Sequence, residues 1–225
     1  MNCNPYQEYL GYNQGAIGGI QADFAENNIC GYIGQPSNVV SSLVYLVFGL
    51  ILITRYKRWD FGILLSLVGV GSIFLHATST NVGQVADFAS IFILVTYFLY
   101  NTLKNSYYSN LISKLIVSSI LFIQLMVLIY LRTYRIAVLA IVLVSLLLLE
   151  NKSIKKLGNR SAEWSKGWGL FIIAFGIWLL DEFRIWDNDS IEHFINAHSI
   201  WHMLTAYCLF LVSKYYILSP KKNED

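Results

Sequence analysis

Two histidines near the C-terminus have a spacing that suits metal binding. His198 and His202 lie four residues apart at the start of the apolar stretch 198–217. On a helix, such residues lie on one face, one turn apart, so both imidazoles could reach the same ion. Two ligands do not complete a structural zinc site, which takes four. A simpler interpretation is that one histidine anchors the helix at a membrane interface and the other finds a hydrogen-bond partner, so metal binding requires further ligands.

A second polar group lies much earlier in the chain. Ser72 and His76 are also four residues apart, at the end of the apolar stretch 61–78, and Asp87 follows eleven residues after His76. An ionisable side chain in a membrane segment is costly and by default indicates function. The alternative is that Asp87 stabilises the N-terminus of the next helix through the helix dipole.

The composition predicts that these residues are positioned by membrane helices. Hydrophobic residues make up 56% of the 225 and charged residues 13%, with a mean hydropathy of +0.51. This is too apolar for an ordinary soluble domain. Stretches of about 17 to 25 apolar residues can span a bilayer. Seven candidates occur, at 38–54, 61–78, 84–103, 111–131, 134–150, 167–182 and 198–217.

We therefore expect an all-α integral membrane protein with a bundle of seven transmembrane helices. Only Leu131–Arg135 separates the fourth and fifth stretches, and the sixth is short, so a count of six stays open. The segment Glu150–Lys166 is expected to be a solvated cytoplasmic loop. Four tyrosines are expected to mark the membrane interface, namely Tyr107, Tyr108, Tyr215 and Tyr216. His193 is expected to be an exposed loop histidine.

The basic residues predict the orientation of the bundle, because Lys and Arg concentrate in cytoplasmic loops. With the N-terminus outside, all of the sixteen Lys and Arg residues except Arg132, Arg135 and Arg184 fall on the cytoplasmic side. We expect an external segment at 1–37, a transmembrane domain at 38–217 and a cytoplasmic tail at 218–225. The first segment holds no Lys or Arg, so no signal peptide is expected. The net charge of +2 follows from this topology and gives no indication of nucleic-acid binding.

This topology brings the polar groups to one side of the membrane. The second helix would end outside near His76, the third would begin outside with Asp87, and the seventh would begin outside at His198 and His202. Three histidines are a typical catalytic zinc set, because the fourth position is left for water or substrate. Zinc lowers the pKa of bound water to about 7. The expected chemistry is hydrolysis inside a membrane.

Taken together, these residues resemble a known family. The pattern Ser72-x-x-x-His76, then Asp87, then His198-x-x-x-His202 is similar to that of the alkaline ceramidases. These are seven-helix enzymes of a superfamily that includes the adiponectin-type receptors, and they share a Ser, an Asp and three His around zinc. The resemblance extends over 23–216.

The resemblance implies a reaction and roles for residues. The reaction is hydrolysis of the amide bond of ceramide to a sphingoid base and a fatty acid. The ceramide substrate would enter the site from the bilayer. The three histidines would hold zinc. Asp87 would act as general base and Ser72 would stabilise the oxyanion, while Asp181, in Trp178-x-x-Asp181, could orient a ligand histidine.

The N-terminal segment carries a possible second metal site. By spacing alone, Asp23 to Asn28 is better explained as a polar turn that caps a short helix than as a set of calcium ligands. However, Asp23-x-x-Glu26-x-Asn28 resembles the calcium-binding segment of the family, where a main-chain carbonyl at the position of Phe24 also contributes. Gln35 stands where a relative supplies a glutamate, which implies lower calcium affinity or an empty site.

Three other functions remain open. The first is a receptor-like protein with structural zinc, against which stand the external acidic segment and the lack of a large cytoplasmic signalling domain. The second is a hydrolase of the same scaffold that acts on another lipid, and the third is a haem protein with histidine ligands. No obligate protein partner is evident. The short loops and the many Asn, Lys, Ile and Tyr residues favour a bacterial inner membrane over a eukaryotic endoplasmic reticulum or Golgi membrane.

Overall fold

The computed structural model describes residues 26, 33–157, 161–183, 185 and 194–218. In this part of the chain the structure is all-helical and contains seven long helices, while the predicted count of seven membrane spans stays a prediction. The short 3-10 helix η1 (Arg132–Tyr134) separates the fourth helix from the fifth. The seven helices are α2 (Pro36–Thr54), α3 (Trp59–Thr78), α4 (Asn81–Ser106), α5 (Asn110–Tyr130), α6 (Arg135–Leu157), α7 (Ala162–Glu182) and α8 (Ala197–Leu218).

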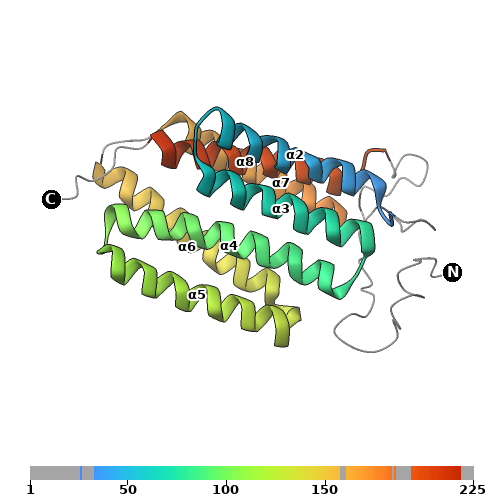
Figure 1. Ribbon diagram of the computed structural model, residues 1–225, viewed down its shortest axis with the longest axis horizontal. Coiled ribbons are helices and arrows are strands. Elements are labelled where there is room, and N and C mark those ends of the chain that lie inside the picture. The colour runs from blue at the N-terminus through green and yellow to red at the C-terminus, as the bar shows by residue number, and fades with distance from the viewer. Residues whose placement is uncertain (1–25, 27–32, 158–160, 184, 186–193, 219–225) are drawn as a thin grey trace.

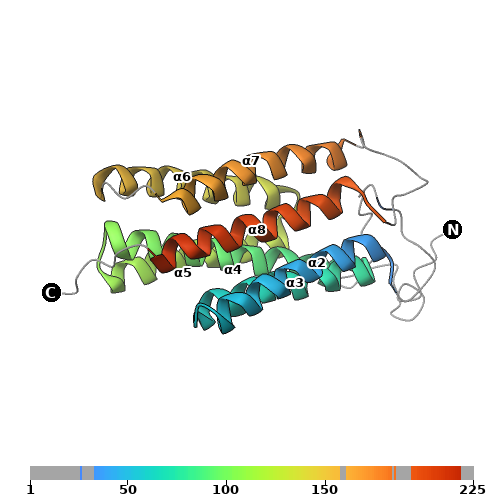
Figure 2. The same cartoon turned by 90° about the horizontal axis from the view of Figure 1, so that it is seen from above.

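The helices form an elongated bundle (Figure 1). Helix α8 packs against α7 on one side and against α2 on the other, and it also contacts α3. Helices α3 and α4 pack together, and α4 in turn contacts α5 and α6. Figure 2 shows α8 between the α6–α7 layer and the α2–α3 layer. The first turns of α2, α4 and α8 therefore lie at the same end of the bundle as the last turns of α3 and α7.

The connection between α3 and α4 is tight and has a clear local cause. Ser79 adopts a left-handed conformation, with φ of 50°, and ends α3. The Thr80 hydroxyl then accepts a hydrogen bond from the Gly83 amide at 2.8 Å and caps α4. The absence of a side chain at Gly71 lets the two helices meet closely, because a Cβ there would lie only 2.9 Å from the Asp87 Cα. This packing places Asp87 beside the last turns of α3.

The apolar character of the helices identifies a membrane-embedded protein. Within the described residues, five helices are long and apolar enough to cross a membrane, namely α2 to α6. The outer helices expose large apolar side chains, such as Leu111 and Phe122 on α5, as expected of a surface that faces lipid. Helices α7 and α8 have similar lengths but are not among the five.

The expectation of a solvated loop over Glu150–Lys166 is wrong. Helix α6 continues to Leu157 and α7 begins at Ala162. Glu150 is 1% exposed, and its Oε2 atom accepts hydrogen bonds from the indole N–H groups of Trp164 and Trp168, each at 2.7 Å. Hydrogen bonds from these donors replace the water that the carboxylate loses on burial.

The tyrosines of the last turns of α8 are also not at an exposed interface. Tyr215 and Tyr216 are each 8% exposed. The Tyr216 hydroxyl donates to Glu150 Oε1 and lies 2.6 Å from the Thr102 hydroxyl of α4. The buried polar partners of Tyr216 lie on two other helices, α4 and α6, and the position of these tyrosines at the level of the membrane interface stays a prediction.

Candidate metal centre

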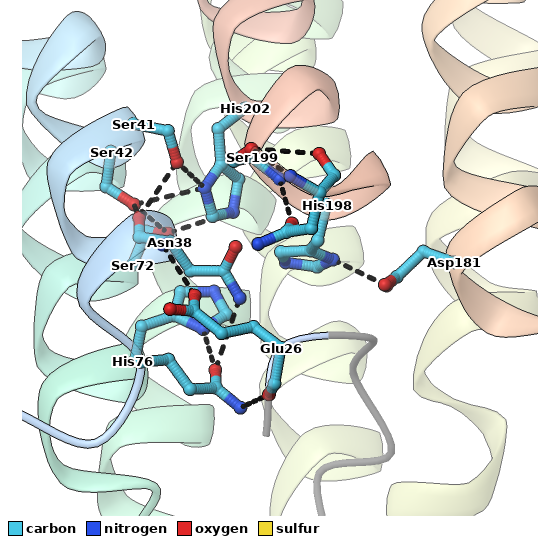
Figure 3. Close-up of polar contacts among 12 residues, drawn as sticks. Glu26, Asn38, Ser41, Ser42, Ser72, His76, Asp181, His198, Ser199 and His202 are labelled. Atoms are coloured by element: carbon cyan, nitrogen blue, oxygen red, sulfur yellow. Dashed lines mark hydrogen bonds and ion pairs between the residues drawn. The ribbon is translucent and has the colours of Figure 1, made fainter. Parts of the chain in front are cut away.

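Two helices bring three histidines together at one end of the bundle. His76 lies in the last turn of α3, while His198 and His202 lie in the first two turns of α8. All three are buried, with exposures of 1%, 5% and 4%. Their candidate ligand atoms all lie within 4.8 Å of one another, and the ring centroids are 4.5 to 4.9 Å apart. Figure 3 shows the three rings facing a common region.

Two of the histidines have their Nδ1 atoms held by oxygen acceptors. His76 Nδ1 lies 2.6 Å from the side-chain oxygen of Gln35, and His198 Nδ1 lies 2.8 Å from Asp181 Oδ2. An amide oxygen and a carboxylate oxygen can only accept, so in both rings Nδ1 carries the proton. In the neutral form of each ring, the lone pair is then on Nε2.

The third histidine, His202, also has its Nδ1 atom held by oxygen acceptors, which are the hydroxyls of two serines of α2. His202 Nδ1 lies 2.9 Å from the Ser41 hydroxyl and 3.2 Å from the Ser42 hydroxyl. Both hydroxyls donate to the main-chain carbonyl of Asn38, at 3.0 and 2.6 Å. Because their protons are already used, the serine oxygens accept from His202 Nδ1.

This donor set fits a metal ion. In their neutral form, the three imidazoles offer Nε2 lone pairs from a buried, converging group. Each Nδ1–H donates to a fixed acceptor, the arrangement that orients histidine ligands in metal sites. Imidazole ligands suit zinc and related transition metals. The group could therefore hold a metal ion, with His76, His198 and His202 as the ligands.

Ser72, the predicted oxyanion-stabilising residue, lies at this group. It is 2% exposed, and its hydroxyl is 2.9 Å from the Ser42 hydroxyl and 3.4 Å from His202 Nε2. The Ser42 proton goes to Asn38, so Ser72 is the donor in the serine pair. Ser72 thus stands beside a nitrogen that would face the metal.

Asp87, the predicted base, lies in the second turn of α4 and is partly exposed. Its main chain packs against Gly71 of α3, the residue before Ser72. Among the described residues, the group of converging ligand atoms does not include the Asp87 carboxylate. Asp87 is therefore placed next to the site without being one of its candidate ligands, and its role as a base stays a prediction.

The described residues of the predicted calcium segment contact helix α2 and the histidine site. The Glu26 carboxylate is buried and accepts from the main-chain amides of Ser37 and Asn38, at 2.9 and 2.8 Å, which caps the first turn of α2. The Gln35 amide donates to the Glu26 carbonyl at 2.9 Å. Three predicted calcium ligands lie outside the described residues: Asp23, Phe24 and Asn28. Calcium binding is not supported by these contacts and stays a prediction.

Sequence reasoning missed the contribution of α2 to the site. Asn38, Ser41 and Ser42 form a polar face at positions i, i+3 and i+4. The two serines of this face contact His202. Gln35 was expected to be a calcium ligand, yet its oxygen holds His76. The polar periodicity was the available signal, because three polar residues on one face of an apolar helix require buried partners.

The comparison with protein families identifies the chain's relatives. The family model described as Ceramidase matches residues 21–225. The chain belongs to the ceramidase family. The match includes all three histidines, Ser72 and Asp87, and the predicted resemblance to ceramidases is confirmed. A search of curated proteins found no match. Membership in the ceramidase family implies hydrolase activity with ceramide as the lipid substrate.

Proposed function

We propose that this protein is an intramembrane, zinc-dependent hydrolase that cleaves the amide bond of ceramide-type lipids. The products would be a sphingoid base and a fatty acid. The observation that carries the proposal is the buried group of His76, His198 and His202, with ligand atoms within 4.8 Å of one another, in a member of the ceramidase family. Three histidine ligands leave a fourth position open, as catalytic zinc sites do.

Each residue of the site has a proposed task in this reaction. Zinc held by the three histidines would polarise the amide carbonyl and lower the pKa of water to about 7. The Asp87 carboxylate takes a proton from the attacking water and passes it to the nitrogen as the C–N bond breaks. The Ser72 hydroxyl turns from Ser42 and donates to the carbonyl oxygen as negative charge develops there.

The acceptors around the histidines keep the donor set in place. The side-chain oxygens of Gln35, Asp181 and Ser41 each accept a hydrogen bond from one Nδ1–H group. They fix the tautomer and the plane of the ring, so that Nε2 keeps its lone pair in the direction of the ion. In this proposal Asp181 acts on His198 alone and has no contact with the substrate.

The membrane arrangement is part of the proposal. We infer seven spans with the N-terminus outside and the C-terminus in the cytoplasm, supported by the distribution of Lys and Arg residues. The site then lies toward the external end, where α2, α4 and α8 begin. The favoured location is a bacterial inner membrane, with an endoplasmic reticulum or Golgi membrane as the eukaryotic equivalent. Exposed apolar side chains on the helices would let a two-chain lipid approach sideways from the bilayer.

The proposal is tested with detergent-purified protein. Zinc content and hydrolysis of a fluorescent ceramide are measured for wild type and His198→Ala. About one zinc per chain in the wild type, with zinc and activity both lost in the variant, is the expected result. Stoichiometric zinc without hydrolysis of any N-acyl lipid would instead favour a receptor-like protein, and hydrolysis of other lipids but not ceramide would favour a different lipid hydrolase.

A further inference from the structure

The side chain of Asn38 has an acceptor atom that no described residue of the protein uses. The residue lies in the first turn of α2 and is 0% exposed. Its side-chain oxygen Oδ1 has no hydrogen-bond partner among the residues that the structure describes. Burial of a carbonyl oxygen without a donor is unfavourable and is uncommon in proteins. Such an atom at a ligand site indicates a donor supplied by the ligand.

The direction of the Asn38 amide is fixed by its neighbours. The Gln35 amide nitrogen donates to the Glu26 carbonyl at 2.9 Å, so the Gln35 oxygen must point the other way. This oxygen accepts from His76 Nδ1 at 2.6 Å and from Asn38 Nδ2 at 3.4 Å. Because Nδ2 is the atom turned to Gln35, Oδ1 is the atom left to face a different partner.

Asn38 is connected to two of the three histidines. Its Nδ2 atom shares the Gln35 oxygen with His76. Its main-chain carbonyl accepts from Ser41, whose hydroxyl accepts from His202 Nδ1. In the view of Figure 3 the Asn38 amide is drawn among the three histidine rings. A donor that reaches Oδ1 would thus belong to a molecule bound at the histidine group.

We propose that Asn38 Oδ1 accepts the N–H of the scissile amide and makes the site selective for N-acyl over O-acyl lipids. The inference rests on the proposed function. The amide N–H is bonded to the carbon under attack, so it must lie close to the metal ligands, whereas other hydroxyls of the lipid lie further along the chain. An ester presents an oxygen at this position, whose lone pairs would face Oδ1 without a proton between them.

The contact also assists bond cleavage. A hydrogen bond from the amide N–H to Oδ1 increases the electron density on nitrogen, the atom that must receive a proton when the C–N bond breaks. Metal ligands and a general base act on amides and esters alike. Asn38 is therefore the residue in this site whose chemistry distinguishes the two.

The test compares wild type with Asn38→Leu on two substrates that share both hydrocarbon chains and differ only in an amide or an ester link. Leucine has a similar shape but no acceptor. We expect kcat/KM for the amide to fall about tenfold, a typical value for one lost hydrogen bond. The ester value should change by less than about threefold. Zinc content should stay that of the wild type.

Gln124→Leu is the matched control. Gln124 on α5 is 1% exposed and also has an amide atom, Nε2, without a partner among the described residues, while its oxygen accepts from Thr96 at 2.8 Å. Because α5 packs on α4 and α6, the ratio of amide to ester activity should be unchanged. If Asn38→Leu does not accumulate as folded protein, Asn38→Ala is used with the same expectation. Asn38→Asp, which keeps an acceptor, should retain the preference for the amide.

The outcomes separate this inference from the proposed function. If Asn38→Leu or Asn38→Ala retains zinc and loses kcat/KM equally for the amide and the ester, the proposed role of Oδ1 is overturned. The proposal that the protein is an amidase would still stand. A wild-type protein that binds zinc but hydrolyses neither lipid would overturn the proposed function, and the assignment of Oδ1 would fall with it.

Discussion

The bundle buries one polar cluster at each end, and helix α8 contributes to both. At one end, His198 and His202 from its first turns meet His76. At the other end, the Tyr216 hydroxyl from its last turns meets Glu150. Both clusters cross several helices, and both are almost fully removed from solvent. The two clusters differ in what their hydrogen-bond acceptors and metal-ligand atoms face.

The oxygens of Glu150 are occupied by donors of the protein itself. Trp164, Trp168 and Tyr216 all donate to this carboxylate, so the cluster stabilises the packing of α6, α7 and α8. In the histidine cluster, each Nδ1 atom is held by a protein acceptor, and the candidate ligand atoms converge on one region. The comparison shows that burial of polar groups does not by itself mark a functional site. The better indication of a functional site is that several lone pairs converge on one region.

The largest expected effect is on the histidine cluster. His202→Ala removes one of three ligands and should lower the bound zinc to near zero and kcat/KM by about 10³-fold or more. Zinc is measured by metal analysis of the purified protein, and activity with a fluorescent ceramide. His193→Ala, at a position predicted to be a loop, is the control and should behave as wild type. Full zinc content in His202→Ala would remove this histidine from the ligand set.

Asp87→Asn should separate metal binding from turnover. Asparagine keeps the size of the side chain but cannot take up a proton, so kcat should fall by about 10² to 10⁴-fold while zinc stays bound. Asp60→Asn is the control, because Asp60 lies at the start of α3 in a partly buried pair with Arg58 at 2.7 Å. An Asp87→Asn variant with full activity would exclude Asp87 as the base.

Asp181→Ala should have an intermediate effect on metal binding. It removes the acceptor of His198 Nδ1, and loss of such a partner typically weakens metal affinity by about 10 to 100-fold. Competition with a zinc chelator measures the change in Kd. Gln35→Leu, which removes the acceptor of His76, should weaken zinc binding in the same range. Unchanged affinity in both variants would show that the rings are oriented by packing alone.

In the Glu150 cluster, a substitution should lower the stability of the protein and leave zinc bound. Glu150→Leu leaves two indole N–H groups and a phenol without their acceptor, which should lower the free energy of unfolding by about 2 to 4 kcal/mol. Thermal unfolding in detergent and the zinc content are measured together. Loss of zinc in a folded Glu150→Leu protein would contradict the separation of the two clusters.

The control for this prediction is Glu163→Gln. Glu163 lies in the first turn of α7 and is 3.7 Å from Lys214, in a partly exposed ion pair. Such pairs contribute about 0 to 1 kcal/mol. We expect no more than a small change in unfolding, and the contrast with Glu150→Leu measures what burial adds.

The sequence alone determined the helices and the ligands of the candidate site. The apolar stretches predicted seven helices, and the spacing of His198 and His202 predicted one helix face, because such patterns depend on neighbours within a turn. The helix order placed His76 at the same end of the bundle. The apolar stretches and the histidine spacing are local signals, and the placement of His76 follows because successive helices run in opposite directions. None of these predictions needs knowledge of how the helices pack.

Only the tertiary structure decided which polar groups are partners. Gln35 holds His76 across 41 positions and Ser41 holds His202 across 161, while the donors to Glu150 include Tyr216, 66 positions away. The sequence instead indicated a calcium ligand at Gln35 and a solvated loop that begins at Glu150. Such pairings depend on the rotation and depth of one helix against another. Because these are set by the packing of many side chains together, no short pattern contains them.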